Sequence, residues 1–351
     1  MVAWDWSPRQ LAALARFLQE RGLTCGPVRA VRIGDGHSNL TYRVIDEAGA
    51  TVVVRRPPPP PTPPGAHDVL REARLISALG GSAVPVAPVL ATASAGEVLD
   101  VPLYVMGYVD GVVVTAQTPP PLDSPSTRRR IGHALVDTLA ALHSVDWRAA
   151  GLAELGRPEG FNSRHVHRMA RLIADDAGRV PDEFADVRQW LLAHVPVESG
   201  AAIVHNDFRL PNVMLSTRRP GEVAAVLDWE LATIGDPLFD LGYFLASVPR
   251  EEPFNPTQAM GIAMLEAGYP SRQELAERYA QRTGADLTHL PWYTVLALWK
   301  LAVLYEYSHR RARQGTGDPY YLDRGLVHAF LDDARRSAGL VSSSPASTRQ
   351  E

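Results

Sequence analysis

The chain has 351 residues, of which 46% are hydrophobic and 21% are charged, and its formal net charge is −4. This composition suits a globular protein with a large core, and the slightly acidic balance gives no reason to expect nucleic acid as a partner. The single cysteine, Cys25, excludes a disulfide framework and a cysteine metal site within the chain. Because the N-terminus does not read as a secretory signal and no apolar run is long enough for a membrane span, we expect a cytoplasmic protein with no membrane partner; its oligomeric state stays open.

Arginine supplies almost all of the positive charge. Of the 35 lysine and arginine residues, only Lys300 is a lysine, and Ala and Pro are abundant. This bias indicates a GC-rich genome. A compositional explanation therefore competes with a functional one for any single arginine.

The N-terminal third predicts a helix followed by a small antiparallel sheet. Ser7 is a suitable N-cap, Pro8 suits the first helical position, Gln10 completes a capping box, and Gly22 ends the apolar periodicity. Runs rich in β-branched residues then alternate with the turn sequences GDGHSN and DEAG. The strands expected here are Val28–Ile33, Thr41–Ile45 and Thr51–Arg55.

A proline-rich stretch separates these strands from the next elements. Pro57–Pro64 contains seven prolines in eight residues and cannot form a helix or a central strand. We interpret it as a stiff surface loop in polyproline II conformation, with a partner-docking motif as the alternative. The elements expected after it are a helix over 68–79 and strands over 84–91 and 103–109.

Beyond the glycines at Gly107 and Gly111, the pattern becomes helical. Residues 128–142 carry an apolar stripe at helical spacing, and most of the chain to Ala338 reads as helix. We predict an α+β protein with a sheet-rich lobe over 1–107, a mainly helical lobe over 108–340, and a loose tail over 341–351.

A polar cluster interrupts an apolar stretch in the second lobe. The sequence IVHNDFRLPNVML, Ile203–Leu215, places an imidazole, a carboxylate, a guanidinium and two amides between apolar ends. Turn chemistry explains Asn206, Asp207 and Pro211. It does not explain the next stretch, AAVLDWELATIGDPLFDLGY, in which an apolar strand ends on Asp228. An amide and carboxylates on adjacent short segments are hard oxygen ligands of the kind that Mg²⁺ prefers.

These two motifs together resemble the catalytic loop and metal-binding Asp of the protein-kinase-like fold. HNDFRLPN…LDWELATIGDPLFDLGY is similar to the aminoglycoside phosphotransferase family, and more narrowly to its branch related to the kinase-like domains fused to some acyl-CoA dehydrogenases. The resemblance extends from about Val28 to about Arg313. It implies a bilobal α+β fold, ATP (or GTP) and Mg²⁺, and transfer of the γ-phosphate to a small-molecule hydroxyl.

The resemblance assigns roles in the second lobe. Asp207 takes the position of the catalytic base, and Asn212 and Asp228 take the positions of the Mg²⁺ ligands. Arg209 is expected to stabilise transition-state charge, with an ion-pair role as the alternative. The residues expected to support the site are His205, which would hold the loop through backbone contacts, Glu230, and Asp240, which would bind the loop's N–H groups. Asp236 reads as a helix cap.

The first lobe must supply a cation for the phosphates. Kinases use a lysine that ends a V-A-I-K strand, whereas this chain has Val52-Val53-Val54-Arg55-Arg56 there. Strand alternation places Arg55 and Arg56 on opposite faces, and we favour Arg55, with Glu72 as its partner. Arginine is bulkier than lysine and bidentate, so the replacement is not neutral.

A glycine-rich turn and a strand end complete the predicted nucleotide site. In GDGHSN the glycines permit close backbone approach and the polar residues can donate to phosphate, although such a turn is also common in plain hairpins. The residues assigned to nucleotide binding are Gly34, Gly36, Ser38 and Asn39 in this turn, and Met106 to Tyr108 as the adenine-binding hinge.

Three classes of function compete. A small-molecule kinase explains every motif, and its acceptor would be a hydroxyacyl compound or its CoA thioester, because the aromatic segment Leu290–Ala312 suits a substrate less cationic than an aminoglycoside. For most of its side chains we favour the alternative, a core helix packed by Trp292, Leu296, Trp299 and Val303. An antibiotic-resistance kinase is the alternative within this class. A nucleotide-binding pseudokinase has only the Lys-to-Arg change in its favour, and a metal-dependent hydrolase using His205, Asp207 and Asp228 leaves Arg55 and Glu72 unexplained.

Overall fold

The computed structural model describes residues 6–34, 39–58, 67–249 and 258–340. The chain separates into two compact units. The first is made from three stretches, Met1–Gly111, Arg148–Leu152 and Ala224–Leu231, and the second from Val112–Trp147, Ala153–Val223 and Ala232–Glu351. Most of the predicted proline loop and the predicted tail over 341–351 lie outside the described residues.

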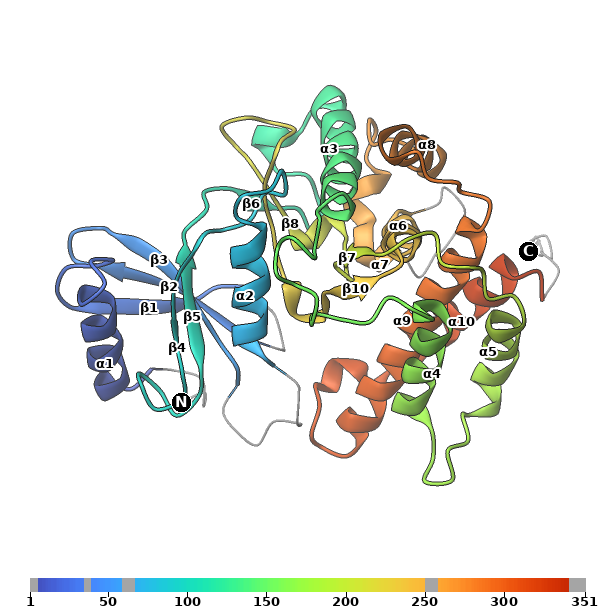
Figure 1. The fold of residues 1–351 in the computed structure, drawn as a ribbon, viewed down its shortest axis with the longest axis horizontal. Coiled ribbons are helices and arrows are strands. Elements are labelled where there is room, and N and C mark those ends of the chain that lie inside the picture. Colours follow the sequence, from blue (N-terminus) through green and yellow to red (C-terminus); the bar gives the residue numbers. More distant parts are fainter. Residues whose placement is uncertain (1–5, 35–38, 59–66, 250–257, 341–351) are drawn as a thin grey trace, which may run out of the picture. The chain divides into compact units, whose positions relative to one another are not determined.

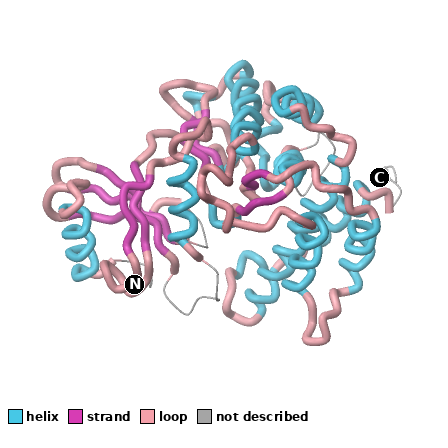
Figure 2. Tube along the Cα trace, in the orientation of Figure 1, coloured by secondary structure: helices cyan, strands magenta, loops and turns pink. Residues whose placement is uncertain are grey.

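Helices and strands are distributed unevenly between the units (Figure 2). The longer strands belong to the first unit: β1 Val28–Arg32, β2 Leu40–Asp46, β3 Thr51–Arg56, β4 Val89–Ala93 and β5 Leu103–Gly107. Short strands follow: β6 Val112–Val113, β7 Ala202–Val204, β8 Val213–Leu215, β9 Val223–Val226 and β10 Thr233–Gly235. The helices are α1 Pro8–Gln19, α2 Val69–Leu79, α3 Pro125–His143, α4 Phe161–Ile173, α5 Asp182–Ala193, α6 Pro237–Ser247, α7 Gln258–Gly261, α8 Arg272–Thr283, α9 Leu290–Arg313 and α10 Gly325–Ser337.

The sheet of the first unit is antiparallel throughout, with strand order β1-β2-β3-β5-β4. Helices α1 and α2 cover its opposite faces (Figure 1). Period-two alternation in β3 determines which side chain meets which helix. Val52 and Val54 join the apolar cluster that includes Leu14 and Leu18 of α1, so Arg55 points to the face covered by α2.

The next residue, Arg56, packs on the α1 side of the sheet, as alternation predicts. It is buried, donates to the Tyr42 hydroxyl at 3.1 Å, and stacks on the rings of Trp6 and Tyr42. Its guanidinium therefore interacts with the aromatic rings of Trp6 and Tyr42 and with the Tyr42 hydroxyl. Arg56 is a structural residue in this fold.

The local signals at the starts of two helices agree with the structure. Ser7 caps α1 and forms the predicted capping box with Gln10, and Asp68 caps α2. The strand predicted over 84–91 is wrong in its first half, because β4 begins only at Val89. Pro85 and Pro88 have no N–H to give to a ladder, and their carbonyls instead accept from Val226 and Gly107.

The second unit is a helical assembly built around α9. This helix packs against α4, α6 and α10, and it buries Trp292, Leu296, Trp299 and Val303. Two small antiparallel pairs, β7 with β10 and β6 with β8, lie in the same unit. Within the described ranges, no helix is both long and apolar enough to cross a bilayer.

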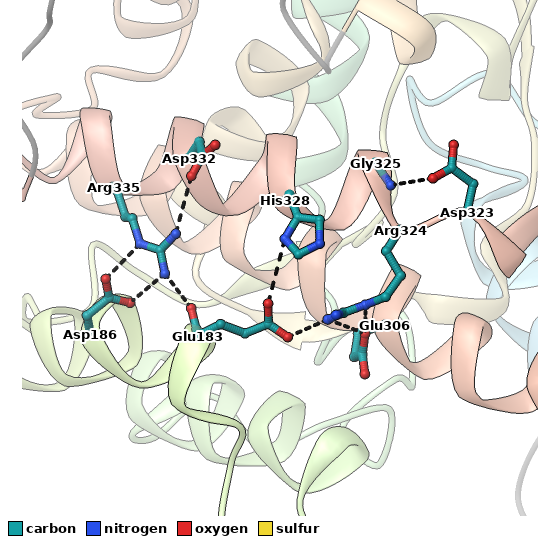
Figure 3. A network of polar contacts seen from close by, with 9 residues as sticks. All are labelled: Glu183, Asp186, Glu306, Asp323, Arg324, Gly325, His328, Asp332 and Arg335. Atoms are coloured by element: carbon teal, nitrogen blue, oxygen red, sulfur yellow. Dashed lines mark hydrogen bonds and ion pairs between the residues drawn. The ribbon is translucent and has the colours of Figure 1, made fainter.

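A network of ion pairs joins α5, α9 and α10 in this unit (Figure 3). Arg324 bridges Glu183 of α5 and Glu306 of α9, and Arg335 of α10 binds Asp186 of α5 at 2.7 Å. His328 lies 3.6 Å from the second carboxylate oxygen of Glu183. Bidentate arginine contacts are directional, so this network fixes the start of α10 against α9.

Candidate active site

The polar segment His205–Asn212 lies between two short buried strands of the second unit. β7 ends at Val204 and β8 begins at Val213, which explains why the segment has apolar ends. His205 is fully buried, and its Nδ1 accepts from the backbone N–H of Asp207 at 3.3 Å. The imidazole therefore contacts the loop backbone, as expected from the sequence.

The carboxylate of Asp240 holds the start of the same loop. It accepts from the backbone N–H of His205, and from that of Asn206 at 2.7 Å. Asn206 has a φ of 72°, a left-handed conformation that only a small set of non-glycine residues adopts readily. The adjacent Asp236 caps α6 by accepting from the N–H of Leu238 at 3.0 Å, as predicted.

Both oxygens of Asp207 have defined partners. Its Oδ2 accepts from Asn212 Nδ2 at 2.7 Å, and the same amide nitrogen donates to the Asp207 carbonyl at 2.8 Å. Its Oδ1 accepts from the Tyr243 hydroxyl at 2.6 Å. Asp207 is the predicted base and Asn212, five residues later, is a predicted metal ligand. The two side chains are thus in direct contact. Neither of these two bonds uses the Asn212 amide oxygen.

Arg209 lies beside the same carboxylate. Its Nε is 3.3 Å from Asp207 Oδ1, and its side chain is 30% exposed. This contact corresponds to the ion-pair role that the sequence left open. A role for Arg209 at the transferred phosphate remains a proposal.

In the first unit, Arg55 is the centre of a carboxylate cluster. Its Nε donates to Glu72 Oε2 at 3.0 Å, its Nη2 donates to Asp228 Oδ1 at 2.6 Å, and its Nη1 donates to the Thr41 hydroxyl at 3.2 Å. The contact expected between Arg55 and Glu72 is present. Arg55 also contacts the carboxylate that the sequence assigned to Mg²⁺.

Glu72 and Tyr104 make this cluster strongly electrostatic. Burial is the largest single effect and disfavours the charge on Arg55, but the charges of Glu72, Tyr104, Asp228 and Glu230 together outweigh it, so the pKa of Arg55 is raised above its ordinary value. Glu72 has only 1% of its side chain exposed and also accepts from the Tyr104 hydroxyl. Burial raises the pKa of Glu72, and Arg55 opposes this shift. The guanidinium therefore compensates a carboxylate that would otherwise be buried alone.

Asp228 and Glu230 lie on the turn that follows β9. Asp228 has a φ of 61° and exposes 36% of its side chain. A non-glycine residue held in this conformation is typical of functional sites, where surrounding structure overcomes the strain. Glu230 accepts from Asn39 Nδ2 at 3.2 Å and lies 4.0 Å from Arg55 Nη2. It thereby joins the predicted phosphate-side cation to the end of the glycine-rich turn.

Only part of that turn can be compared with its prediction. Gly34 has a φ of 77° and needs the freedom of glycine, and Asn39 is buried. Gly36 and Ser38 lie outside the described residues. In the predicted hinge, Met106 pairs with Val53 at the end of β5, and Tyr108 is exposed with Arg43 over its ring.

Two residues near the catalytic loop escaped sequence reasoning. Tyr243 lies three positions after Asp240 and donates to Asp207, while Lys300 comes from α9, far along the chain, and donates to the Asn206 carbonyl. Nothing in local spacing links either residue to the HxD motif. For Lys300 there was one signal, its uniqueness among the basic residues.

The donor set of the predicted metal site fits Mg²⁺ chemically. Asp228 offers a partly exposed carboxylate and Asn212 an amide oxygen, which are hard ligands that work together with phosphate oxygens. Among the described residues, no group of three or more His, Cys, Asp or Glu side chains could hold a metal without such outside ligands.

The chain is similar to several known proteins. The chain is 30% identical over 315 residues to acyl-CoA dehydrogenase family member 10 from Mus musculus, covering 86% of this chain and 28% of that relative. A structure from Ralstonia eutropha, provisionally assigned as an aminoglycoside phosphotransferase, is 29% identical with a TM-score of 0.76 and covers 93% of this chain and 98% of that one. Aminoglycoside phosphotransferase APH(4)-Ia, solved with AMP-PNP and hygromycin B, shares 18% identity, a TM-score of 0.60, and coverage of 93% and 98%.

The fold is therefore protein-kinase-like, in the form adopted by small-molecule phosphotransferases. The sequence profile of the phosphotransferase enzyme family matches residues 29–275, and the chain belongs to that family. It spans well under half the length of the curated relatives it matches. The predicted fold class and family are confirmed.

Proposed function

We propose that the protein is an ATP-dependent kinase that transfers the γ-phosphate to a hydroxyl of a small molecule, with GTP as the alternative donor. The observation that carries the proposal is the position of Arg55, whose guanidinium binds Glu72 at 3.0 Å and Asp228 at 2.6 Å. A cation fixed by one buried carboxylate and placed beside a potential metal ligand is what phosphate binding requires. A metal-dependent hydrolase using His205, Asp207 and Asp228 would not need this cation.

The reaction follows from the residues in each unit. The acceptor hydroxyl oxygen attacks the γ-phosphorus, the bond to the β–γ bridging oxygen breaks, and ADP leaves. Asp207 orients the hydroxyl and takes up its proton, and the contacts from Tyr243 and Asn212 hold the carboxylate in one orientation. Asn212 and Asp228 would hold Mg²⁺, which neutralises phosphate charge when bound.

Arg55 has a matching task on the nucleotide. Its Nη2 is paired with Asp228. With nucleotide bound, this nitrogen would donate to a phosphate oxygen in place of Asp228, while Nε stays on Glu72. The guanidinium can exchange one anion for another because its fork has several donors in fixed directions.

For the acceptor we propose a hydroxyacyl compound or its CoA thioester. The similarity to a protein named for acyl-CoA dehydrogenation supports this class. The side chains of Trp292, Leu296, Trp299 and Val303 in α9 do not add to this support, because they are buried in the core. A small pocket in the second unit is lined by Tyr305, Tyr320, Tyr321, Asp323 and Leu326.

This pocket is aromatic with one carboxylate. Burial and the neighbouring tyrosines raise the pKa of Tyr305 to about 12, with smaller effects from Arg209 and Asp207, so its phenol is neutral at working pH. The Asp323 carboxylate already accepts from the Gly325 N–H at 2.8 Å (Figure 3). A polycationic aminoglycoside needs several free carboxylates. The pocket therefore favours a weakly charged acceptor.

The free thiol of Cys25 is exposed. An exposed thiol survives in a reducing compartment, which supports a cytoplasmic location for this reaction.

The test is a screen of purified protein for acceptor-dependent ATP consumption. Hydroxy acids, hydroxyacyl-CoA thioesters, aminoglycosides and macrolides would be offered with Mg·ATP and Mg·GTP, with Asp207→Ala as the negative control and mass spectrometry of the product. Phosphorylated hydroxyacyl product, absent with Asp207→Ala, supports the proposal. Phosphorylation of an antibiotic alone would move the protein to the resistance class. Tight nucleotide binding with no transfer to any acceptor would favour the pseudokinase.

A further inference from the structure

The only lysine of the chain, Lys300, is buried beneath the catalytic loop. Its residue exposure is 2%, and it projects from the middle of α9. The ammonium donates to the carbonyl of Asn206 and to its side-chain Oδ1, the latter at 3.2 Å. It also stands over the rings of Tyr243, 4.4 Å from the centroid, and Phe239, 5.1 Å from the centroid.

These contacts hold the backbone of Asn206, the residue directly before Asp207, in place. The N–H of Asn206 is held by Asp240 at 2.7 Å, and its carbonyl is held by Lys300. The two peptide groups that flank Asn206 are therefore each fixed by a charged partner. Such bonds are stronger than neutral ones, and they support a left-handed residue that the backbone alone disfavours.

Tyr243 connects the same ammonium to the carboxylate of Asp207. Its ring lies under Lys300 Nζ, and its hydroxyl donates to Asp207 Oδ1 at 2.6 Å. Burial, followed by the charge of Asp207, raises the pKa of Tyr243 well above its usual value. The phenol therefore remains a donor throughout the physiological range.

We propose that Lys300 and Tyr243 form a positioning pair for the catalytic base, in which the ammonium fixes the turn at Asn206 and the phenol fixes the carboxylate of Asp207. The inference rests on the proposed kinase function and deepens it. Neither residue contacts the substrate in this role. Loss of the positive charge on Lys300 loosens the turn and misplaces Asp207, which lowers turnover and leaves nucleotide binding intact.

The surroundings of Lys300 give this pair a pH dependence. Burial lowers the pKa of Lys300 to about 8, while Asp207 and Asp240 favour the charged form and Arg168 and Arg209 oppose it. Of the other groups that face it, His165 has a pKa lowered well below its usual value, chiefly by burial, and Tyr243 stays protonated. Turnover should accordingly fall as the pH rises through about 8.

The effect on stability has the opposite sign, which makes the two separable. The unfolded-state pKa of Lys300 is 10.5, so between about 8 and 10.5 the unfolded chain binds a proton that the folded chain has released. Stability from this group therefore rises with pH in that window. A decline in turnover above pH 8 without a decline in Tm would distinguish positioning from simple unfolding.

The experiment compares Lys300→Met, Lys300→Arg and Tyr243→Phe with the wild-type enzyme. We expect kcat to fall about tenfold to a hundredfold in Lys300→Met and Tyr243→Phe, as for loss of a hydrogen bond to a charged group, with the Kd for Mg·ATP within about threefold. The Tm of Lys300→Met should change little, because removal of a buried charge offsets the lost hydrogen bonds to Asn206. Lys300→Arg should retain activity and lose the alkaline decline.

Arg310→Met is the matched control. Arg310 lies on the same helix and also donates to a backbone carbonyl, that of Ile173 at 2.8 Å, but away from the catalytic loop. It should keep wild-type kcat. If Lys300→Met keeps kcat within about threefold of wild type, or if wild-type turnover stays level to pH 9.5, the proposal is wrong.

Hydrogen exchange of the segment over 203–212 separates this proposal from the proposed function. Faster exchange in Lys300→Met than in wild type, confined to this segment, supports positioning even if no acceptor is ever found. Unchanged exchange overturns it. Absence of phosphate transfer by the wild-type enzyme to any acceptor would refute the kinase function alone.

Discussion

Replacement of Arg55 by alanine tests the nucleotide side of the site most directly. We expect Arg55→Ala to lower turnover at least about tenfold, because a charge-assisted contact to the phosphates is lost. Arg55→Lys should recover part of the activity, since the charge returns without the fork. Glu72→Ala should resemble Arg55→Ala, and the double variant should be little worse than either, because the two side chains act as one unit.

The structural penalty of Arg55→Ala can be worked out from Glu72. Without Arg55, the buried Glu72 carboxylate can avoid an unpaired charge by binding a proton. The ordinary pKa of Glu is 4.5, so protonation at pH 7, which is 2.5 pH units higher, costs at most about 3.4 kcal/mol at about 1.36 kcal/mol per unit. At pH 5 the same penalty is only about 0.7 kcal/mol. Because the folded-state pKa of Glu72 is raised, stability is lost as the pH rises above 4.5. Thermal melts at pH 5 and 7 would measure this.

A compensating change separates folding from catalysis. Arg55→Ala combined with Glu72→Gln removes the lone charge, so its Tm at pH 7 should recover while its kcat stays low. Arg56→Ala is the control, because Arg56 is the next residue on the strand but contacts Trp6 and Tyr42. It should lose stability and keep kcat. If Arg55→Ala kept wild-type kcat and Arg56→Ala lost it, the assignment of Arg55 as the cation that binds the phosphates would be wrong.

Asp207→Ala should lower transfer about 10²–10⁴-fold with little change in the Kd for ATP, as expected for a general base; activity within threefold of wild type in a coupled kinase assay would remove Asp207 from that role. Asp228→Asn should abolish the Mg²⁺ dependence of nucleotide binding, and calorimetry with and without EDTA would reveal an unaltered metal effect if the assignment is mistaken. Asp236→Ala should destabilise the protein by about 3 kcal/mol or more without altering the metal dependence, because it removes a buried N-cap that also accepts from Ser199, Asn162 and Tyr293. A urea midpoint within error of wild type would contradict that assignment.

Local rules anticipated much of the fold and part of the site. The cap at Ser7, the alternation that separates Arg55 from Arg56, and the contact of Arg55 with Glu72 all depend on periodicity and short-range chemistry. The start of β4 was missed because β-branched residues outweighed the prolines at 85 and 88 in the prediction. Here the absence of an N–H, a property of the backbone, decided the structure.

The supporting residues could not be predicted in the same way. Lys300 reaches Asn206 across 94 positions and Tyr243 reaches Asp207 across 36, and only the packing of α6 and α9 brings them together. Periodicity predicts which face of a helix is buried but not which loop that face will meet. In α9, composition suggested a substrate surface while helical spacing predicted a core helix for Trp292, Leu296, Trp299 and Val303, and the structure buries these four side chains.

The first unit is discontinuous in sequence, and this has a consequence for synthesis. Its main stretch ends at Gly111, but Ala224–Leu231, which carries Asp228 and Glu230, belongs to the same unit. The ribosome must add 112 further residues (223 − 111) before that stretch begins, about 6–22 s at 5–20 residues per second. Throughout that interval, Glu72 is the one carboxylate partner of Arg55 already synthesised among the described residues. A fragment ending at Gly111 would have the same gap permanently, so the unit cannot be excised as one continuous piece with its charge cluster complete.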